Sequence, residues 1–244
     1  MKLILTSSLG GAVKLNGKRL PCGFPTENKL PDTLRACWKS PSRVILIAAS
    51  PDFYEKNDDL AACFRQSFPL NGLPISALEL CDARNPELAA RICEADVLIF
   101  PGGHVPTQNA FYHRLQLRQR LRAFSGLVIA WSAGSMNCAE TVYAAPEFPG
   151  EALDPNYRRW LPGLGLTALN IFPHFQDLQG ELLDGLRVVE DITFADSMGH
   201  DLIALNDGSY IFIDETGRRL FGEAFRIRDG IVTKLCERGA SVQL

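Results

Sequence analysis

A buried strand that stops at a serine is predicted over residues 126–135, Gly126-Leu127-Val128-Ile129-Ala130-Trp131-Ser132-Ala133-Gly134-Ser135. The five apolar residues 127–131 are typical of a strand that is covered on both faces. Ala130 and Gly134 flank Ser132 at two residues on either side, and their small size allows a sharp turn from strand to helix. The stretch is a variant of the G-x-S-x-G nucleophile elbow. The alternative is a serine that only caps the next helix.

Strand and helix patterns alternate on both sides of this stretch. Strands are predicted at 2–7, 43–49, 74–80, 96–100 and 127–131, and helices at 53–68, 86–94, 107–123 and 133–140. Strands separated by helices predict a three-layer, doubly wound α/β fold, with a mainly parallel sheet and helices on both faces. In such sheets the site lies at the carboxyl ends of the strands, where Ser132 is expected.

The remaining segments are assigned from their turn residues. We expect a loop at 141–163, a strand at 164–171 and a helix at 180–190. Four short tail segments, 201–206, 209–213, 219–227 and 230–236, are separated by Thr216-Gly217 and two Asp-Gly pairs, which favour hairpins. They predict antiparallel strands added at the C-terminal end of the sheet. Residues 9–42 predict a loop-rich insertion with a short helix near 32–39, which we hypothesise reaches over the site. One domain, 1–244, is expected.

Composition limits the function. The chain has 244 residues, 46% hydrophobic and 22% charged, and a net charge of −3. It has no basic run that would favour nucleic acid and no apolar run long enough to span a membrane. The seven cysteines form no C-x-x-C pair, and residues 1–6 lack the features of a signal peptide. We therefore expect a cytoplasmic protein.

A serine nucleophile needs a base to accept its proton. His174 follows a predicted strand, and its neighbour Pro173 fixes the backbone there. Its strand end is expected on the same rim as Ser132. His104 lies in a glycine turn and could line the site, whereas His113 has the surroundings of a surface residue and His200 those of a turn residue.

The acid and the oxyanion donors have weaker signals. Asp207 begins the turn after a predicted strand, and Asp154, Asp201 and Asp214 compete with it on the sequence alone. Gly102-Gly103 frees backbone N–H groups to face a substrate. No phosphate-binding loop or spaced metal-ligand cluster is present, so neither a nucleotide nor a metal is expected.

Four segments together resemble the peptidase E family, the α-aspartyl dipeptidases, whose relatives include cyanophycinase. They are Pro101-Gly102-Gly103-His104, Ala130-Trp131-Ser132-Ala133-Gly134-Ser135-Met136-Asn137, Asn170-Ile171-Phe172-Pro173-His174-Phe175 and Ile203-Ala204-Leu205-Asn206-Asp207-Gly208-Ser209-Tyr210-Ile211. The resemblance covers roughly residues 96–213. It implies the sheet architecture of class I glutamine amidotransferases.

The resemblance also implies roles for single residues. Ser132 matches the nucleophile, His174 the base, and Asp207 falls where the family has a glutamate as the acid. The oxyanion donors match the N–H groups of Ala133 and of Gly103 or His104. On the substrate side we place Gly102, Trp131 and Asp154, the last because Asp154-Pro155-Asn156 matches a D-P-N segment of the family.

One departure concerns specificity. The family binds the acidic side chain of its substrate with an arginine on the helix after the histidine. The corresponding residues 179–187 are rich in acidic side chains and have only the late Arg187. Aspartate specificity is therefore not implied.

The predicted function is a serine peptidase of the peptidase E type that hydrolyses dipeptides or small peptides through an acyl-enzyme, without metal or cofactor. Two alternatives stay open: a non-catalytic descendant that binds a small ligand or a partner, and an amidase or esterase with a non-peptide substrate. A homodimer also stays open.

Overall fold

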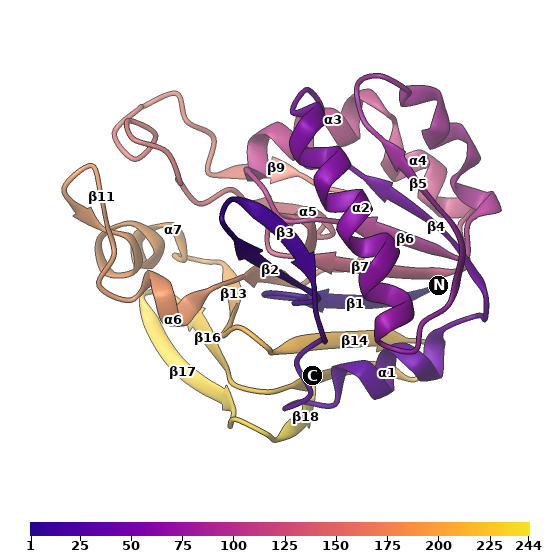
Figure 1. The fold of residues 1–244 in the computed structure, drawn as a ribbon. Coiled ribbons are helices and arrows are strands. Elements are labelled where there is room, and N and C mark those ends of the chain that lie inside the picture. The colour runs from indigo at the N-terminus through magenta and orange to yellow at the C-terminus, as the bar shows by residue number, and fades with distance from the viewer.

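A computed structural model describes residues 1–244. The centre of its fold is an eight-stranded sheet (Figure 1). Its order is β18-β15-β14-β1-β7-β6-β4-β5. The five strands from β1 to β5 in this order are parallel, and β14, β15 and β18 extend the sheet antiparallel beside β1. The bounds are β1 (Lys2–Thr6), β4 (Ser42–Ile47), β5 (Ile75–Cys81), β6 (Val97–Phe100), β7 (Leu127–Trp131), β14 (Tyr210–Asp214), β15 (Gly217–Phe221) and β18 (Ser241–Gln243). The predicted mixed α/β fold with a mainly parallel sheet is confirmed.

Alternate residues of the parallel strands face two separate cores. In β7, Val128 and Ala130 belong to one core, while Leu127 and Ile129 belong to the other. Because successive side chains of a strand point to opposite faces, both faces of the sheet are buried. The first core includes residues of η1 (Pro86–Glu94), α3 (Val105–Arg114), α4 (Leu117–Arg120) and η2 (Leu121–Ala123). The second includes residues of α1 (Leu30–Cys37) and α2 (Tyr54–Leu70).

A smaller, four-stranded sheet lies beside the large one and has the order β10-β13-β16-β17. Its strands are β10 (Asn170–Phe172), β13 (Asp201–Leu205), β16 (Ala224–Arg228) and β17 (Ile231–Cys236). The prediction that all tail strands extend one sheet was therefore wrong for β13, β16 and β17. The chain crosses between the sheets in the turn from β13 to β14 and again from β15 to β16, where Gly222 has a φ of 88°.

Several predicted helices and one predicted strand differ from the structure. Residues 180–190 contain the hairpin of β11 (Leu182–Leu183) and β12 (Leu186–Arg187) in place of a helix, because Asp184 and Gly185 adopt positive φ in a tight turn. A π-helix, η3 (Val188–Thr193), and α7 (Phe194–Asp196) follow. The helix at 107–123 is broken at Gln116, whose φ is 54°. Of the strand predicted at 164–171, only the end is present as part of β10.

The loop predicted at 141–163 contains β8 (Thr141–Tyr143) and β9 (Trp160–Pro162), which pair antiparallel. The remaining helices, α5 (Ala133–Asn137) and α6 (Phe175–Leu178), are short. The helix predicted to begin at Ala133 therefore ends earlier than expected. No helix has the length and apolar character that a bilayer crossing requires.

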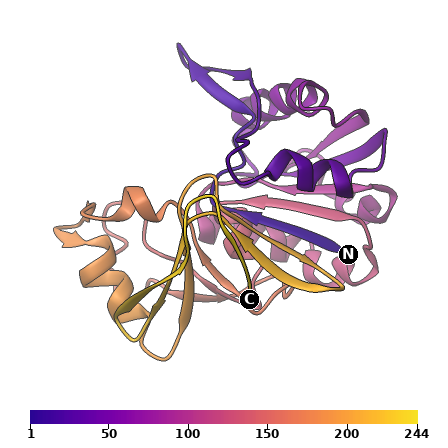
Figure 2. The same cartoon turned by 90° about the horizontal axis from the view of Figure 1, so that it is seen from below.

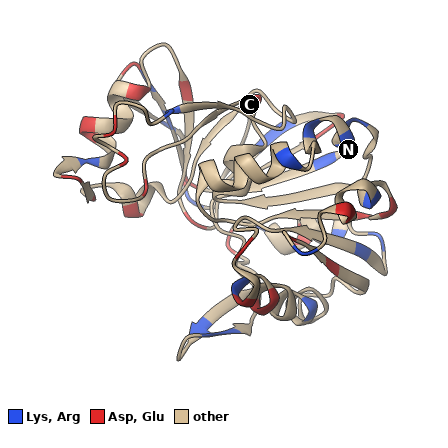
Figure 3. Cartoon of the chain, turned by 90° about the horizontal axis from the view of Figure 1, so that it is seen from above, with Lys and Arg blue, Asp and Glu red and all other residues tan.

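The insertion at 9–42 is more ordered than a loop. The hairpin β2 (Ala12–Leu15) and β3 (Lys18–Pro21) projects from the body of the protein (Figure 2). Helix α1 then packs on the large sheet, and the Asn28 side chain donates a 2.8 Å hydrogen bond to Gly208 O. Acidic and basic residues are interspersed over the elements (Figure 3).

Candidate active site

Ser132 occupies a sharp turn at the carboxyl end of β7. Its φ is 51° and its ψ is −125°. This conformation is energetically unfavourable for a residue that has a Cβ, so the surrounding packing must maintain it. Ser132 N donates a 3.0 Å hydrogen bond to Thr6 O of the neighbouring strand β1. A Cβ on Gly134 would lie 2.0 Å from Phe100 O, so only glycine fits where α5 leaves the turn. The predicted strand–serine–helix turn is present.

The glycine turn after β6 lies against this serine. A Cβ on Gly102 would be 3.0 Å from Ser132 Cβ, which places the two turns in contact. The backbone N–H groups of Gly103, His104 and Ala133 donate to no group of the protein. Unpaired donors around a serine can stabilise an oxyanion. These are the residues that the sequence analysis assigned to that task.

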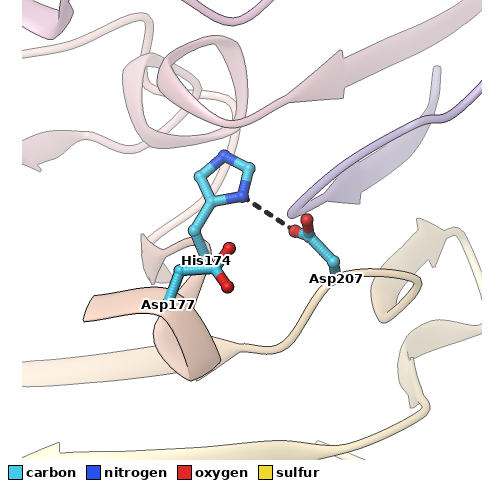
Figure 4. A group of neighbouring side chains, drawn as sticks. All are labelled: His174, Asp177 and Asp207. Carbon is cyan, nitrogen blue, oxygen red and sulfur yellow. Dashed lines mark hydrogen bonds and ion pairs between the residues drawn. The ribbon is translucent and has the colours of Figure 1, made fainter. Parts of the chain in front are cut away.

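His174 and Asp207 meet at the ends of two strands of the smaller sheet. His174 follows β10, Asp207 follows β13, and His174 Nδ1 is 2.8 Å from Asp207 Oδ1 (Figure 4). The side chains are 35% and 42% exposed, so both remain accessible to a ligand. Because Nδ1 faces the carboxylate, Nε2 is the ring nitrogen left for chemistry. Ser132 Oγ and His174 form no hydrogen bond in this state.

The pKa values of the pair shift in opposite directions. Burial of the imidazole opposes its protonation, but the hydrogen bond to Asp207 and the carboxylate charge outweigh this effect and raise the pKa of His174. Burial also disfavours the charged form of Asp207, yet the hydrogen bonds from His174 and Ser7 lower the pKa of Asp207. An imidazole next to an ionised carboxylate is the arrangement of a general base and its orienting acid.

The competing acids lie elsewhere. Asp201 pairs with Arg226 and Arg228, and Asp214 accepts hydrogen bonds from Thr216. Asp154 is exposed and accepts from Asn156 within its own turn, so it does not contact His174.

Two histidines lie outside this constellation. His113 and His200 are both exposed, and the ring of His200 stacks on Trp160 with 3.9 Å between their centroids. Neither histidine forms a hydrogen bond with Ser132.

Three further residues support the site and were missed from the sequence. The Ser7 hydroxyl bonds to Asp207, and Gln176 Oε1 accepts a 2.9 Å hydrogen bond from Asp207 N. Glu151 Oε1 lies 3.0 Å from His104 Nε2, without the alignment of a hydrogen bond. Only Ser7 had a signal in the sequence, because it is a polar residue at the carboxyl end of a predicted strand.

Acidic residues also approach from the loop between β8 and β9. Glu151 accepts hydrogen bonds from the backbone N–H groups of Glu147 and Phe148. Although part of the Glu147 side chain is exposed to solvent, crowding by the surrounding protein and repulsion from Glu151 raise the pKa of Glu147 to about 7, against an opposing effect of His174. The loop thus adds negative charge beside the histidines.

Asp177 completes a group of three metal-ligand types. His174, Asp177 and Asp207 offer donor atoms that all lie within 4.8 Å of one another (Figure 4). Such a set could accept a cation, but Nδ1 of His174 already has a protein partner in Asp207. The hydrogen bond between His174 and Asp207 already explains why two of these three residues lie together.

A pocket of about 190 Å³ opens beside the serine turn. Its walls include Gly102 and Trp131, Leu9 at the start of the insertion, and two cationic side chains, Arg19 and Lys56. Arg19 pairs with Asp59 at 2.7 Å, whereas Lys56 has no ion-pair partner. Residues of the insertion therefore line a pocket next to the serine turn.

The chain is similar to known peptidases in sequence and in structure. The model of peptidase family S51 matches residues 23–221. A peptidase from an acI-B1 Actinobacterium is similar in structure, with a TM-score of 0.68 and 16% identity over 100% of this chain and 96% of its own. A putative peptidase E protein from Listeria monocytogenes EGD-e has a TM-score of 0.57 and 14% identity over 96% and 98%. No curated protein is significantly similar in sequence.

Proposed function

Because the chain belongs to peptidase family S51, in agreement with the resemblance found in its sequence, we propose that it is a serine peptidase that hydrolyses dipeptides or other small peptides. The observation that carries this proposal is the 2.8 Å contact between His174 Nδ1 and Asp207 Oδ1, on the same rim as the strained Ser132 turn. In the proposal Ser132 is the nucleophile, His174 the base and Asp207 the acid.

In the first half-reaction His174 Nε2 accepts the hydroxyl proton while Ser132 Oγ attacks the scissile carbonyl carbon. The oxyanion is bound by the free N–H groups of Ala133 and of Gly103 or His104. His174 then gives the proton to the leaving amine, the C–N bond breaks and an acyl-enzyme remains. The Ser132 hydroxyl turns to His174 when substrate binds, since hydrogen bonds between catalytic groups often tighten only in the complex.

In the second half-reaction water hydrolyses the acyl-enzyme. His174 accepts a proton from the water, which attacks the ester carbonyl, and returns that proton to Ser132 Oγ as the acid product leaves. Asp207 stays ionised and stabilises the imidazolium in both halves.

The pocket beside Gly102 and Trp131 is where one substrate side chain would lie. Lys56, which has no ion-pair partner, gives its wall positive charge, whereas the charge of Arg19 is balanced by Asp59; no acidic side chain lines the pocket. The stretch where the family has its substrate-binding arginine forms the β11–β12 hairpin instead, and Arg187 is paired there with Asp191. The pocket therefore favours a substrate with an acidic side chain, which would be bound by residues outside the β11–β12 hairpin. The predicted Asp154 lies outside this pocket wall.

A fluorophosphonate probe and a dipeptide library test the proposal. Ser132→Ala should abolish labelling and lower turnover by several orders of magnitude, since the nucleophile is lost. Ser125→Ala is the matched control, because Ser125 is an exposed serine at the opposite end of β7. Unchanged hydrolysis in Ser132→Ala would exclude the mechanism.

The same assays separate the two rival functions. A wild-type protein that reacts with the probe but cleaves esters or amides, and no dipeptide, is an esterase or amidase. A protein that binds peptides but is not labelled is a non-catalytic descendant of the family. Dipeptides with acidic, neutral and basic residues at each position identify the preferred side chain.

A further inference from the structure

We propose that Ser7 is a positioning residue of the catalytic site, whose hydroxyl fixes the His174–Asp207 pair relative to the strand that carries Ser132. This inference rests on the function proposed above. It concerns a residue that belongs to neither the nucleophile turn nor the pair itself.

The Ser7 hydroxyl joins the base and the acid directly. Ser7 Oγ donates a 2.6 Å hydrogen bond to Asp207 Oδ1 and accepts a 2.7 Å hydrogen bond from the backbone N–H of His174. Ser7 is fully buried. A hydroxyl has one hydrogen, and because His174 N–H occupies the acceptor side, that hydrogen is directed at Asp207. Asp207 Oδ1 therefore accepts one hydrogen bond from the Ser7 hydroxyl and another from His174 Nδ1.

The backbone of Ser7 is tied to the nucleophile. In the parallel pairing of β1 with β7, Thr6 is opposite Trp131, so Ser7 and Ser132 are the first residues after the two strands. Ser132 N donates to Thr6 O at 3.0 Å, and Ser7 N donates to Ser209 O at 3.3 Å. The Ser7 side chain thus extends from the strand beside the nucleophile to residues of the smaller sheet.

The pair needs such a support because neither member is held by a regular element. His174 has a left-handed φ of 55° at the start of α6. Asp207 lies in the turn by which the chain passes from β13 to β14, and its side chain is 42% exposed. Without Ser7, the carboxylate loses one of its hydrogen-bond donors, is held less firmly against His174, and can rotate towards solvent. Rotation would leave the imidazole without a partner that selects its tautomer.

Ser7→Ala tests this role, with fluorophosphonate labelling of Ser132 as a readout that needs no known substrate. We expect labelling and kcat to fall about 10- to 100-fold, as for a small misplacement of a catalytic group, with little change in KM. The NMR titration midpoint of His174 should move to lower pH, as in Asp207→Ala, because the carboxylate is lost as a partner. In the Asp207→Ala background the Ser7→Ala change should cost less than about threefold.

Ser197→Ala is the matched control for loss of a buried hydroxyl. Ser197 is also fully buried, donates to Phe194 O at 2.8 Å and accepts from Gly230 N at 3.0 Å, far from the pair in the hydrogen-bond network. It should leave labelling and the His174 titration unchanged. If Ser7→Ala does not fold, Ser7→Cys keeps the shape of the side chain, with a slightly larger volume, and a weak donor. It should then show a smaller loss of labelling and a smaller shift of the His174 titration.

The outcomes separate this inference from the proposed function. Wild-type protein that is not labelled at Ser132 overturns the proposed function. Wild-type protein that is labelled, with a Ser7→Ala or Ser7→Cys variant that retains the wild-type rate and the wild-type His174 titration, overturns only the role of Ser7. If Ser7→Ala lowers labelling by the same factor in the Asp207→Ala background as in the wild type, the role is also overturned, because Ser7 would then not act through Asp207.

Discussion

At the scale of single residues, the protonation of His174 is expected to determine the pH dependence of the proposed reaction. Its pKa lies above the ordinary value of about 6.5. The base must be neutral, so kcat/KM should fall as the pH decreases through this pKa, with a midpoint above about 6.5. Asp207 stays ionised throughout this range because its pKa is lowered. A pH–rate profile of the free enzyme measures the midpoint.

The Asp207→Asn variant gives the sign of the carboxylate's effect. Burial, which disfavours the imidazolium, is then opposed only by the charges of Asp177 and Glu147, so the midpoint should move to lower pH while turnover drops. Asp154→Asn, which changes an exposed aspartate in its own turn, should leave the midpoint in place. A wild-type midpoint at or below about 6.5 would contradict the assigned pairing.

Features that depend on neighbouring residues, such as the Ser132 turn, could be predicted from the sequence. Contacts between segments that are distant in the sequence could not. Ser132 and its glycine could be recognised because a sharp strand-to-helix turn demands small neighbours within five residues. Asp207 could not be chosen over Asp154, Asp201 and Asp214, because the choice depends on contacts between segments that are distant in sequence. The bond from Ser7 to Asp207 joins residues 200 positions apart and has no local pattern.

At the scale of elements, turn chemistry overrode the helical pattern at 180–190. Asp184 and Gly185 favour the positive φ values of a tight turn, and the hairpin β11–β12 forms around them. The parallel strands were predictable because both of their faces are buried and their apolar runs are unbroken. The second sheet was not, since hairpin signals show that strands pair but not which sheet they join.

The insertion element supports the turn that holds the acid. Asn28 is buried, its side chain donates to Gly208 O at 2.8 Å, and its own carbonyl accepts a 3.1 Å hydrogen bond from Tyr210. Asn28→Ala should cost about 1–3 kcal/mol in the free energy of unfolding, because the partly buried carbonyl of Gly208 loses its donor. Turnover should decrease as well, since Asp207 precedes that glycine.

Urea unfolding and steady-state kinetics measure both effects. Asn156→Ala is the control, because Asn156 is exposed and its side chain contacts only Asp154. If Asn28→Ala lowered stability but left kcat and the His174 titration at their wild-type values, the insertion would stabilise the fold without supporting the acid.

At the scale of the whole molecule, the proposed site is divided between the two sheets. Ser132 and the glycine turn belong to the eight-stranded sheet, and His174 follows a strand of the four-stranded sheet. Asp207 lies in the connection between them. The two sheets share one core, which contains Val128 of β7 and Ile203 of β13. Their relative position is thus set by apolar packing below the rim and by a few polar contacts at the rim.

This division predicts that activity is lost before the fold. The rim contacts are partly exposed and should open at a lower free energy than the shared core. In increasing urea, fluorophosphonate labelling should therefore decline at concentrations where far-UV circular dichroism still reports native structure. Ser7→Ala, which removes one of the contacts between the sheets, should widen the gap between the two transitions, whereas Ser197→Ala should leave the gap unchanged. Coincident transitions in the wild type would mean that the rim opens only with the core.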